Sequence, residues 1–138
     1  MAASTREPAS AERTREVMER YLSSDHSDAS MMAEDAVFTV MATGQEHRGR
    51  EGILQMLQYF YHQAFDARAE TRLTLYDAGH AVFEGEFVGT HTGEFAGIPA
   101  TGRAVRVPLC VVYDIAGGEI ASGRVYFEMP VLMAQLTA

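Results

Sequence analysis

The hydrophobic pattern changes its period about halfway along the chain, from helical spacing to alternation. The stretch AERTREVMERYLSS carries one apolar stripe among Glu and Arg, which predicts an amphipathic helix with Ser10 as its N-cap. The stretch SDASMMAEDA predicts a short second helix that opens at Ser27 or Asp28. A third helix is predicted from near Arg50 through Phe65, where apolar residues recur at helical spacing over a broad face.

Alternation of apolar and polar residues predicts four long strands, over residues 69–76, 81–92, 105–115 and 120–129. Before the third helix, a strand over residues 37–42 is expected to turn at Thr43-Gly44 and to return over residues 45–48. The last residues, 130–138, predict a short helix with Pro130 in its first turn. Helices followed by a run of long antiparallel strands are typical of an α+β domain.

Pro108 conflicts with the strand pattern around it, because proline cannot donate a ladder hydrogen bond. Either the strand lies at an edge of the sheet at this point, or it carries a bulge. A strongly curved sheet would favour the bulge.

Length and charge restrict the class of protein. A chain of 138 residues, 47% of them hydrophobic, fits one globular domain, which we assign to residues 10–138 after a flexible N-terminus of residues 1–9. The net charge of −8 argues against a nucleic-acid partner, because phosphate binding needs clustered Lys and Arg. No apolar run is long enough to cross a bilayer, and the N-terminus lacks the apolar stretch of a secretory signal, so no membrane partner is expected.

Four of the five histidines and the single cysteine do not indicate a metal site. His26, His47, His62 and His80 are scattered, with neither HxH nor HExxH spacing, so we expect no metal ion. Cys110 alternates with apolar neighbours in a predicted strand, which indicates a buried, inert thiol rather than a nucleophile. One cysteine cannot form an internal disulfide, and a reducing cytoplasm is the expected setting.

The stretch GTHTGEFAGIPATGR, residues 89–103, joins two predicted strands. Its glycines and Pro99 supply turn chemistry, and no lysine or following helix supports a phosphate-binding loop. His91 lies on the strand before the turn, on the same face as Phe83 and Phe87. It is either a ligand-binding group or a hydrogen-bonded residue at the rim of the apolar face.

The last predicted strand has two different faces. Arg124, Tyr126 and Glu128 alternate on one face, and the other face is wholly apolar. The polar face is either solvated, with a cross-strand salt bridge, or the floor of a pocket. In a pocket, Glu128 would transfer a proton, Tyr126 would donate a hydrogen bond and Arg124 would stabilise an anion.

Three segments, GTHTGEFAGIPATGR, VPLCVVYDIAGGEI and RVYFEMPVLMAQL, closely resemble the SnoaL-like polyketide cyclases of the NTF2-like superfamily. The resemblance is specific over residues 89–136 and looser upstream, where it depends on helix order and on the start of the third helix. It implies a cone in which N-terminal helices pack on a strongly curved, mostly antiparallel sheet around an apolar pocket. It also implies a homodimer, since the convex side of the sheet usually pairs with another copy.

The reaction that the resemblance implies is an intramolecular aldol-type ring closure of a small apolar or polyketide-like molecule, without metal or organic cofactor. The acid-base residue of the family is an aspartate seven positions before the glutamine of a closing Gln-Leu pair. Counting back from Gln135 reaches Glu128, so the acid is present but one methylene longer, which moves the carboxyl group by about 1.5 Å. This difference favours a protein that binds a hydrophobic ligand without turnover. A related isomerase or epoxide hydrolase, and a dimeric scaffold whose cone is filled by its own side chains, are further alternatives.

Overall fold

The computed structural model describes residues 9–24 and 26–138, so the predicted flexible N-terminus, residues 1–9, lies outside the described residues except for Ala9. The elements follow in the order α1 (Ala11–Leu22), β1 (Met32–Val40), β2 (Gln45–Arg48), α2 (Gly49–Gln58), a π-helical segment (Tyr59–Gln63), β3 (Phe65–Asp77), β4 (His80–His91), β5 (Ala104–Ala116), β6 (Glu119–Phe127) and α3 (Met129–Thr137).

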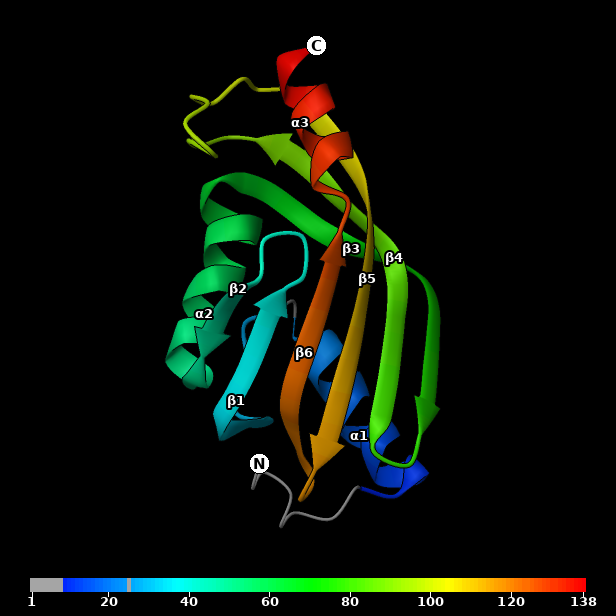
Figure 1. Ribbon diagram of the computed structural model, residues 1–138. Helices are drawn as coiled ribbons and strands as arrows, with labels where there is room; N and C mark the ends of the chain where they lie inside the picture. Colours follow the sequence, from blue (N-terminus) through cyan, green and yellow to red (C-terminus); the bar gives the residue numbers. More distant parts are fainter. Residues whose placement is uncertain (1–8, 25) are drawn as a thin grey trace.

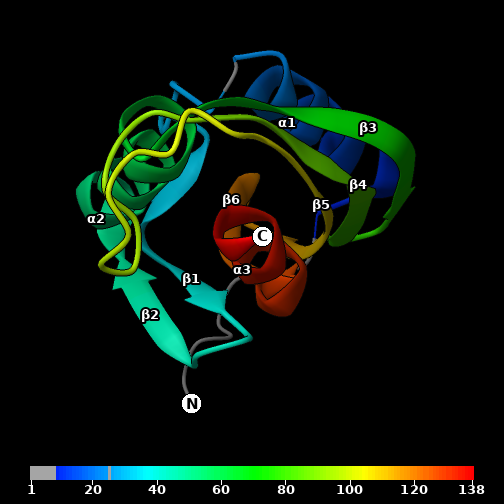
Figure 2. The same ribbon diagram turned by 90° about the horizontal axis from the view of Figure 1, so that it is seen from above.

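The six strands form one mixed sheet in the order β2-β1-β6-β5-β4-β3. Neighbouring strands are antiparallel, except that β1 and β6 run parallel. The sheet is strongly curved and unclosed, and α1 lies behind it on the concave side (Figure 1). Seen from above, the strands curl around α3, which lies over one end of the sheet (Figure 2). Across the described residues, three α-helices on a curved sheet confirm the predicted α+β, NTF2-like cone.

The second predicted helix, residues 27–36, is wrong. Asp28 instead accepts a hydrogen bond from the backbone N–H of Ser30 at 2.8 Å, which makes a turn, and β1 begins at Met32. Met32 is fully buried and pairs with Ile120 of β6. The two residues are distant in the sequence, so the local pattern could not predict their pairing. The tertiary pairing decides the structure here, against the helical pattern of the segment.

The third predicted helix ends earlier than expected. After α2, the chain forms a π-helical segment closed by a bond of 2.7 Å from Ala64 N–H to the carbonyl of Tyr59. Phe65, expected to complete the helical face, begins β3 and pairs with His91. The extra residue in a π-helical turn rotates the following side chains, which allows both Phe60 and Tyr61 to face the concave side of the sheet.

Pro108 lies where β5 extends past the end of β6, which confirms the edge alternative. β6 ends at Phe127, opposite Leu109. The carbonyl of Pro108 accepts a bond from Glu128 N–H at 3.3 Å, so the nitrogen of Pro108 faces the same side, where β6 has already ended. The pairing of β4 with β5 continues through Pro108 without a register shift, which excludes a bulge between these two described strands.

A side chain of α3 pairs with the exposed edge of β5. Gln135 accepts a bond from Arg106 N–H through Oε1 and donates one to the Arg106 carbonyl through Nε2, each at 2.9 Å. Its amide group therefore makes the two bonds that a residue of a neighbouring strand would make. This contact fixes α3 against β5 at one end of the cone.

Candidate functional site

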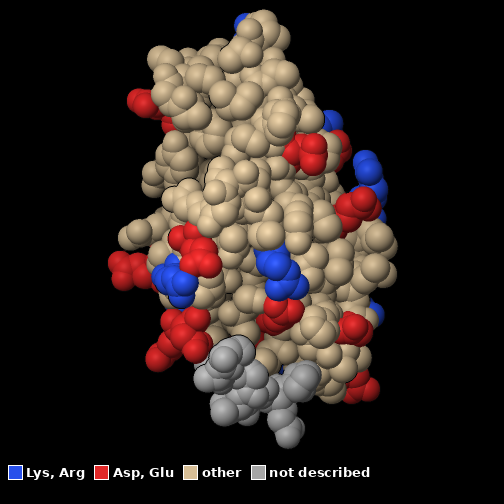
Figure 3. Space-filling model, in the orientation of Figure 1, with Lys and Arg blue, Asp and Glu red and all other residues tan. Residues whose placement is uncertain are grey.

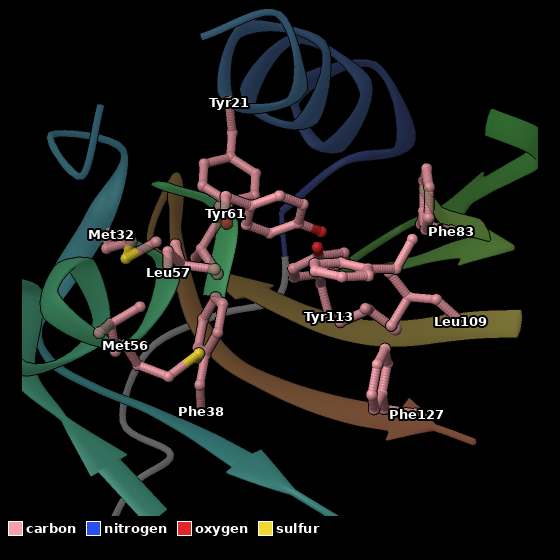
Figure 4. Packing of buried hydrophobic residues seen from close by; sticks show 14 of the residues in the cluster. Tyr21, Met32, Phe38, Met56, Leu57, Tyr61, Phe83, Leu109, Tyr113 and Phe127 are labelled. Atoms are coloured by element: carbon pink, nitrogen blue, oxygen red, sulfur yellow. The ribbon is translucent and has the colours of Figure 1, made fainter. Parts of the chain in front are cut away.

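An apolar cavity lies between the helices and the concave face of the sheet, and Figure 4 shows many of the side chains around it. Sixteen residues line it, from α1 and the following loop, β1, α2, the π-helical segment, β4, β5 and β6. The cavity among them has a volume of about 60 Å³. A cavity needs at least ~10–15 Å³ to hold one water molecule, so side chains alone do not fill the cone.

Alternate residues of the strands form most of the cavity wall. The buried residues of β5 alternate without interruption from Val105 to Ile115, and those in the middle of this run face the cavity. Gly123 of β6 pairs with Phe38 of β1, and a Cβ at position 123 would lie 3.0 Å from the Phe38 ring. The absence of a side chain at this glycine therefore makes room for the aromatic ring that forms the wall.

The polar groups of the cavity are three tyrosines and one histidine. Tyr21 of α1 and Tyr113 of β5 meet edge to face, with ring centroids 6.0 Å apart. The imidazole of His26 stacks on Tyr61 at 4.3 Å and lies 5.8 Å from the ring of Tyr21. Figure 4 shows the three tyrosines gathered beside one another. The remaining lining residues are apolar, so any polar contact with a ligand in the cavity comes from this group.

Burial determines the protonation of two of these hydroxyl groups. Burial, together with the nearby hydroxyls of Tyr113 and Tyr61, raises the pKa of Tyr21 well above its usual value. The pKa of Tyr113 is raised for the same principal reason. Both phenols therefore remain protonated at physiological pH and can donate hydrogen bonds. The Oη of Tyr21 is buried and has no partner that meets hydrogen-bond geometry in the described part of the chain, although the Tyr113 hydroxyl is its neighbour.

The predicted placement of Glu128, Arg124 and Tyr126 at the floor of the apolar pocket is wrong. Their side chains face the outer, convex side of the sheet, because the alternate residue Phe127 faces the cavity. Glu128 is exposed, and with Tyr126 it borders a shallow groove on the outer surface. The polar face of the last strand is therefore the solvated face, which was the alternative interpretation of the same pattern.

The salt bridge expected on a solvated face is present. Arg124 donates to Oδ2 of Asp114 on β5 at 2.6 Å, and Ser122 donates to the same carboxylate. Burial alone would raise the pKa of Asp114, but the hydrogen bonds from Arg124 and Ser122 outweigh it and lower the pKa. Arg124 thus stabilises the outer surface of the sheet and does not contribute to the cavity wall.

His91 is buried and does not line the cavity. Its Nδ1 accepts a bond from Thr101 N–H at 3.1 Å and contacts the Thr101 hydroxyl at 2.9 Å. Backbone bonds also connect His91 with Gly102 and Arg103. The side chain and the backbone of His91 therefore join the two ends of the loop between β4 and β5. Of the two expectations for His91, the hydrogen-bonded residue matches this geometry.

Four cavity residues were missed by the sequence analysis, namely Tyr21, His26, Tyr61 and Tyr113. Three of them were hidden among apolar residues, because a tyrosine on a core-facing stripe looks like a packing residue. His26 was set aside because it has no histidine partner in the sequence. The detectable signal was a hydroxyl at a core-facing position, which has to find a hydrogen-bond partner.

Neither a metal cluster nor a membrane span is found in the described part of the molecule. Within residues 9–24 and 26–138, no group of three His, Cys, Asp or Glu side chains could hold a metal ion. No helix in the same residues is long and apolar enough to cross a membrane.

The curved sheet, the helices on its concave side and the cavity define an NTF2-like protein with the ketosteroid isomerase-like fold. The chain belongs to the SnoaL-like polyketide cyclase family, whose model matches residues 12–136. The family resemblance of the sequence is thus confirmed over nearly the whole chain. No protein of curated function matches the sequence significantly.

Solved structures share this fold at low sequence identity. A protein of Jannaschia sp. CCS1 assigned to the SnoaL-like polyketide cyclases matches with a TM-score of 0.82 and 16% identity over 99% of each chain. A protein of Catenulispora acidiphila DSM 44928 in complex with trimethylamine has a TM-score of 0.71 and 18% identity over 90% of this chain and 94% of that chain. AclR from Streptomyces galilaeus, named as a hydroxylase, has a TM-score of 0.77 and 17% identity over 93% and 98%. At these identities the likeness shows the fold alone.

Proposed function

We propose that this protein binds a small, mostly apolar molecule in the cone and catalyses a cofactor-free acid-base ring closure of the intramolecular aldol type. The observation that carries the proposal is the cavity, whose walls are apolar and aromatic and whose polar groups converge at Tyr21, Tyr61 and Tyr113. Cavities of this kind, with few convergent polar groups, are the usual sites of small-molecule binding. Membership of the SnoaL-like family supports the reaction class.

Binding in the cavity is tested by a pair of adjacent valines on β5. Val111 faces the cavity, and Val112 faces the outer side of the sheet. We expect Val111→Phe to weaken binding of the apolar fluorophore N-phenyl-1-naphthylamine at least ~10-fold, because the added ring occupies ligand space. Val112→Phe adds the same volume outside the cavity and should leave the affinity unchanged. Equal affinities of the two folded variants would show that the probe binds elsewhere.

The group that we propose for proton transfer is His26. Imidazole gains and loses a proton between pH 5 and 8, and the ring of His26 lies against Tyr61 at the wall of the cavity. No carboxylate is among the described residues that line this space, so Glu128 would need a rearrangement to reach a ligand there. A general acid-base group contributes typically ~10²–10⁴-fold to a rate, so His26→Gln should reduce turnover of a polyketide ester by that factor.

A matched control separates catalysis from folding. His62 is exposed and does not line the cavity, and His62→Gln should retain full turnover. The competing function is binding without turnover, which the outward position of Glu128 favours. If the unsubstituted protein binds polyketide esters in the cavity without releasing a ring-closed product, that second function is correct.

We propose in addition that the convex face pairs with a second copy of the chain. Large apolar side chains are exposed there, with Leu73 at 44%, Leu75 at 54% and Tyr126 at 45%. Figure 3 shows much of the outer surface as uncharged, with small groups of acidic and basic side chains. Leu75→Arg should convert a dimer to a monomer in sedimentation velocity, whereas Gln45→Arg on β2 should not. A monomeric unsubstituted protein would contradict the proposal.

A cytoplasmic location is also proposed. Cys110 is a free thiol at the outer groove, and burial together with Glu84 raises its pKa. Such a thiol persists in a reducing compartment without forming a disulfide. Fractionation of the native cells, followed by detection with a specific antibody, tests this location.

A further inference from the structure

We infer that the cavity selects uncharged ligands with an oxygen acceptor, and that the hydroxyl of Tyr21 donates a hydrogen bond to that oxygen. The inference depends on the proposed function, because it concerns the ligand of the same cavity. It adds the chemical character that the ligand must have and names the residue that recognises it.

The first step is the unsatisfied hydroxyl of Tyr21. This side chain is 1% exposed and lines the cavity. Its Oη has no partner with full hydrogen-bond geometry among residues 9–24 and 26–138, although the Tyr113 hydroxyl is close enough to interact with it. Buried polar groups are nearly always paired, because leaving one without a partner costs free energy. A ligand oxygen at this point of the cavity would supply the missing partner.

The second step is the direction of that bond. Burial and the neighbouring hydroxyls of Tyr113 and Tyr61 raise the pKa of Tyr21, so its proton is retained. A phenol that keeps its proton next to another protonated phenol is best matched by an acceptor, such as the oxygen of a ketone or an ester. The edge-to-face packing of Tyr21 and Tyr113 presents both rings to the same cavity, so an acceptor there can be reached from α1 and from β5.

The third step is charge. The described residues that line the cavity include no Arg, Asp or Glu, and His26 is their sole group that can become a cation. A carboxylate in this space would lose its hydration without gaining a permanent positive partner, which is costly in an apolar environment. The arrangement therefore favours a neutral carbonyl over a carboxylate of the same size.

The fourth step is shape. Aromatic rings surround the path from the tyrosines to the other end of the cavity, with Phe38, Phe83, Phe87 and Phe127 on the sheet side. Phe87 and Phe127 meet edge to face with ring centroids 5.6 Å apart, so together they form a continuous aromatic part of the wall. A ring compound with one carbonyl group fits this combination of aromatic walls and a single polar end.

Three probes with one ring skeleton test the inference at pH 8.5. These are 1-tetralone, which carries a carbonyl group, tetralin, which carries no polar group, and tetralin-1-carboxylate, which carries a charge. Each is measured by displacement of N-phenyl-1-naphthylamine from the full-length protein. We expect 1-tetralone to bind at least as tightly as tetralin and at least ~10-fold more tightly than the carboxylate, because the hydrogen bond offsets the stronger hydration of the ketone.

Tyr21→Phe then isolates the hydroxyl group. It should weaken binding of 1-tetralone about 10-fold and leave tetralin within about twofold, since it removes one buried hydrogen bond and retains the ring. Tyr126→Phe, on the outer face, should change neither affinity. The comparison of the three probes on the unsubstituted protein remains decisive even if Tyr21→Phe does not fold.

The outcomes distinguish a failure of the proposed binding function from a failure of the inference about the ligand. If neither tetralin nor 1-tetralone displaces the fluorophore, and Val111→Phe does not affect the fluorophore, the proposed binding function fails and the inference fails with it. If both probes bind in the cavity but tetralin binds more tightly than 1-tetralone, the inference alone is wrong. The same holds if Tyr21→Phe weakens both probes equally, or if the carboxylate binds as tightly as the ketone.

Discussion

Replacement of Tyr21 by phenylalanine should stabilise the ligand-free protein while it impairs ligand recognition. The substitution keeps the buried ring and removes one hydroxyl group that has no hydrogen-bond partner in the described structure. An unsatisfied buried polar group costs about 1–3 kcal/mol. Because the hydroxyl of Tyr113 is close enough to offset part of this cost, we expect a gain of about 1 kcal/mol in the free energy of unfolding. For a domain of this size, that gain corresponds to a rise of about 3–4 °C in Tm.

The measurement is urea unfolding followed by far-ultraviolet circular dichroism, with no ligand present. Tyr59→Phe is the matched control, because Tyr59 Oη donates to the carbonyl of Glu94 at 2.8 Å and its side chain is partly exposed. That variant loses a satisfied hydrogen bond and should be destabilised by about 0.5–1 kcal/mol. The two substitutions remove the same atom, so the predicted changes have opposite signs. If Tyr21→Phe is destabilised as much as Tyr59→Phe, the Tyr21 hydroxyl is satisfied in the free protein and the reasoning is refuted.

Three other predictions concern the sheet and its loop. Asp114→Asn should lower the free energy of unfolding at pH 7 by up to about 1 kcal/mol, as measured by urea titration. The lowered pKa of Asp114 stabilises the protein above about pH 4, and this contribution is lost progressively as the pH falls further. A deficit that does not become smaller between about pH 5 and pH 2.5 would contradict the assignment. Gln135→Ala should lower the free energy of unfolding by about 1–2 kcal/mol and speed amide hydrogen exchange at Arg106, because the N–H of Arg106 loses its acceptor. An unchanged exchange rate at Arg106 would disprove the contact. Gly93→Ala would place a Cβ 2.4 Å from the backbone carbonyl oxygen of Gln63, so it should lower the free energy of unfolding by at least about 1–3 kcal/mol. Gly97→Ala should lower it less, because position 97 has open space around it and only its positive φ of 79° is unfavourable.

Local patterns predicted most of the elements of this fold. Alternation located β4, β5 and β6 to within two residues at each end, and helical spacing located α1 and α2. The errors fall where long-range pairing decides the structure. Residues 32–36 have a helical pattern but extend β1, because Met32 pairs with Ile120 of β6 and the parallel pairing resumes at Val37 after a register shift. Phe65 continues a helical stripe but begins β3, because it pairs with His91.

The candidate site was predicted less well than the fold. Alternation correctly separated Arg124 and Tyr126 from Phe127, since successive residues of a strand face opposite sides. The pocket hypothesis then assigned the polar side to the interior. In the structure the apolar side faces the interior, and the polar side meets water and the Asp114 carboxylate.

The sequence by itself determined which residues share a face of each strand, that the chain is an α+β domain, and that it resembles the SnoaL-like cyclases. Only the tertiary structure decided which polar groups meet in the cavity. Tyr21 comes from the first helix and Tyr113 from the fifth strand, and His26 lies in a loop between them in the sequence. Their approach depends on the curvature of the sheet and on the packing of α1 against its concave side, which are properties of the whole assembly of strands. A periodic pattern predicts which side of a helix or strand is apolar. It does not predict which residues of different elements lie close together once the sheet has folded.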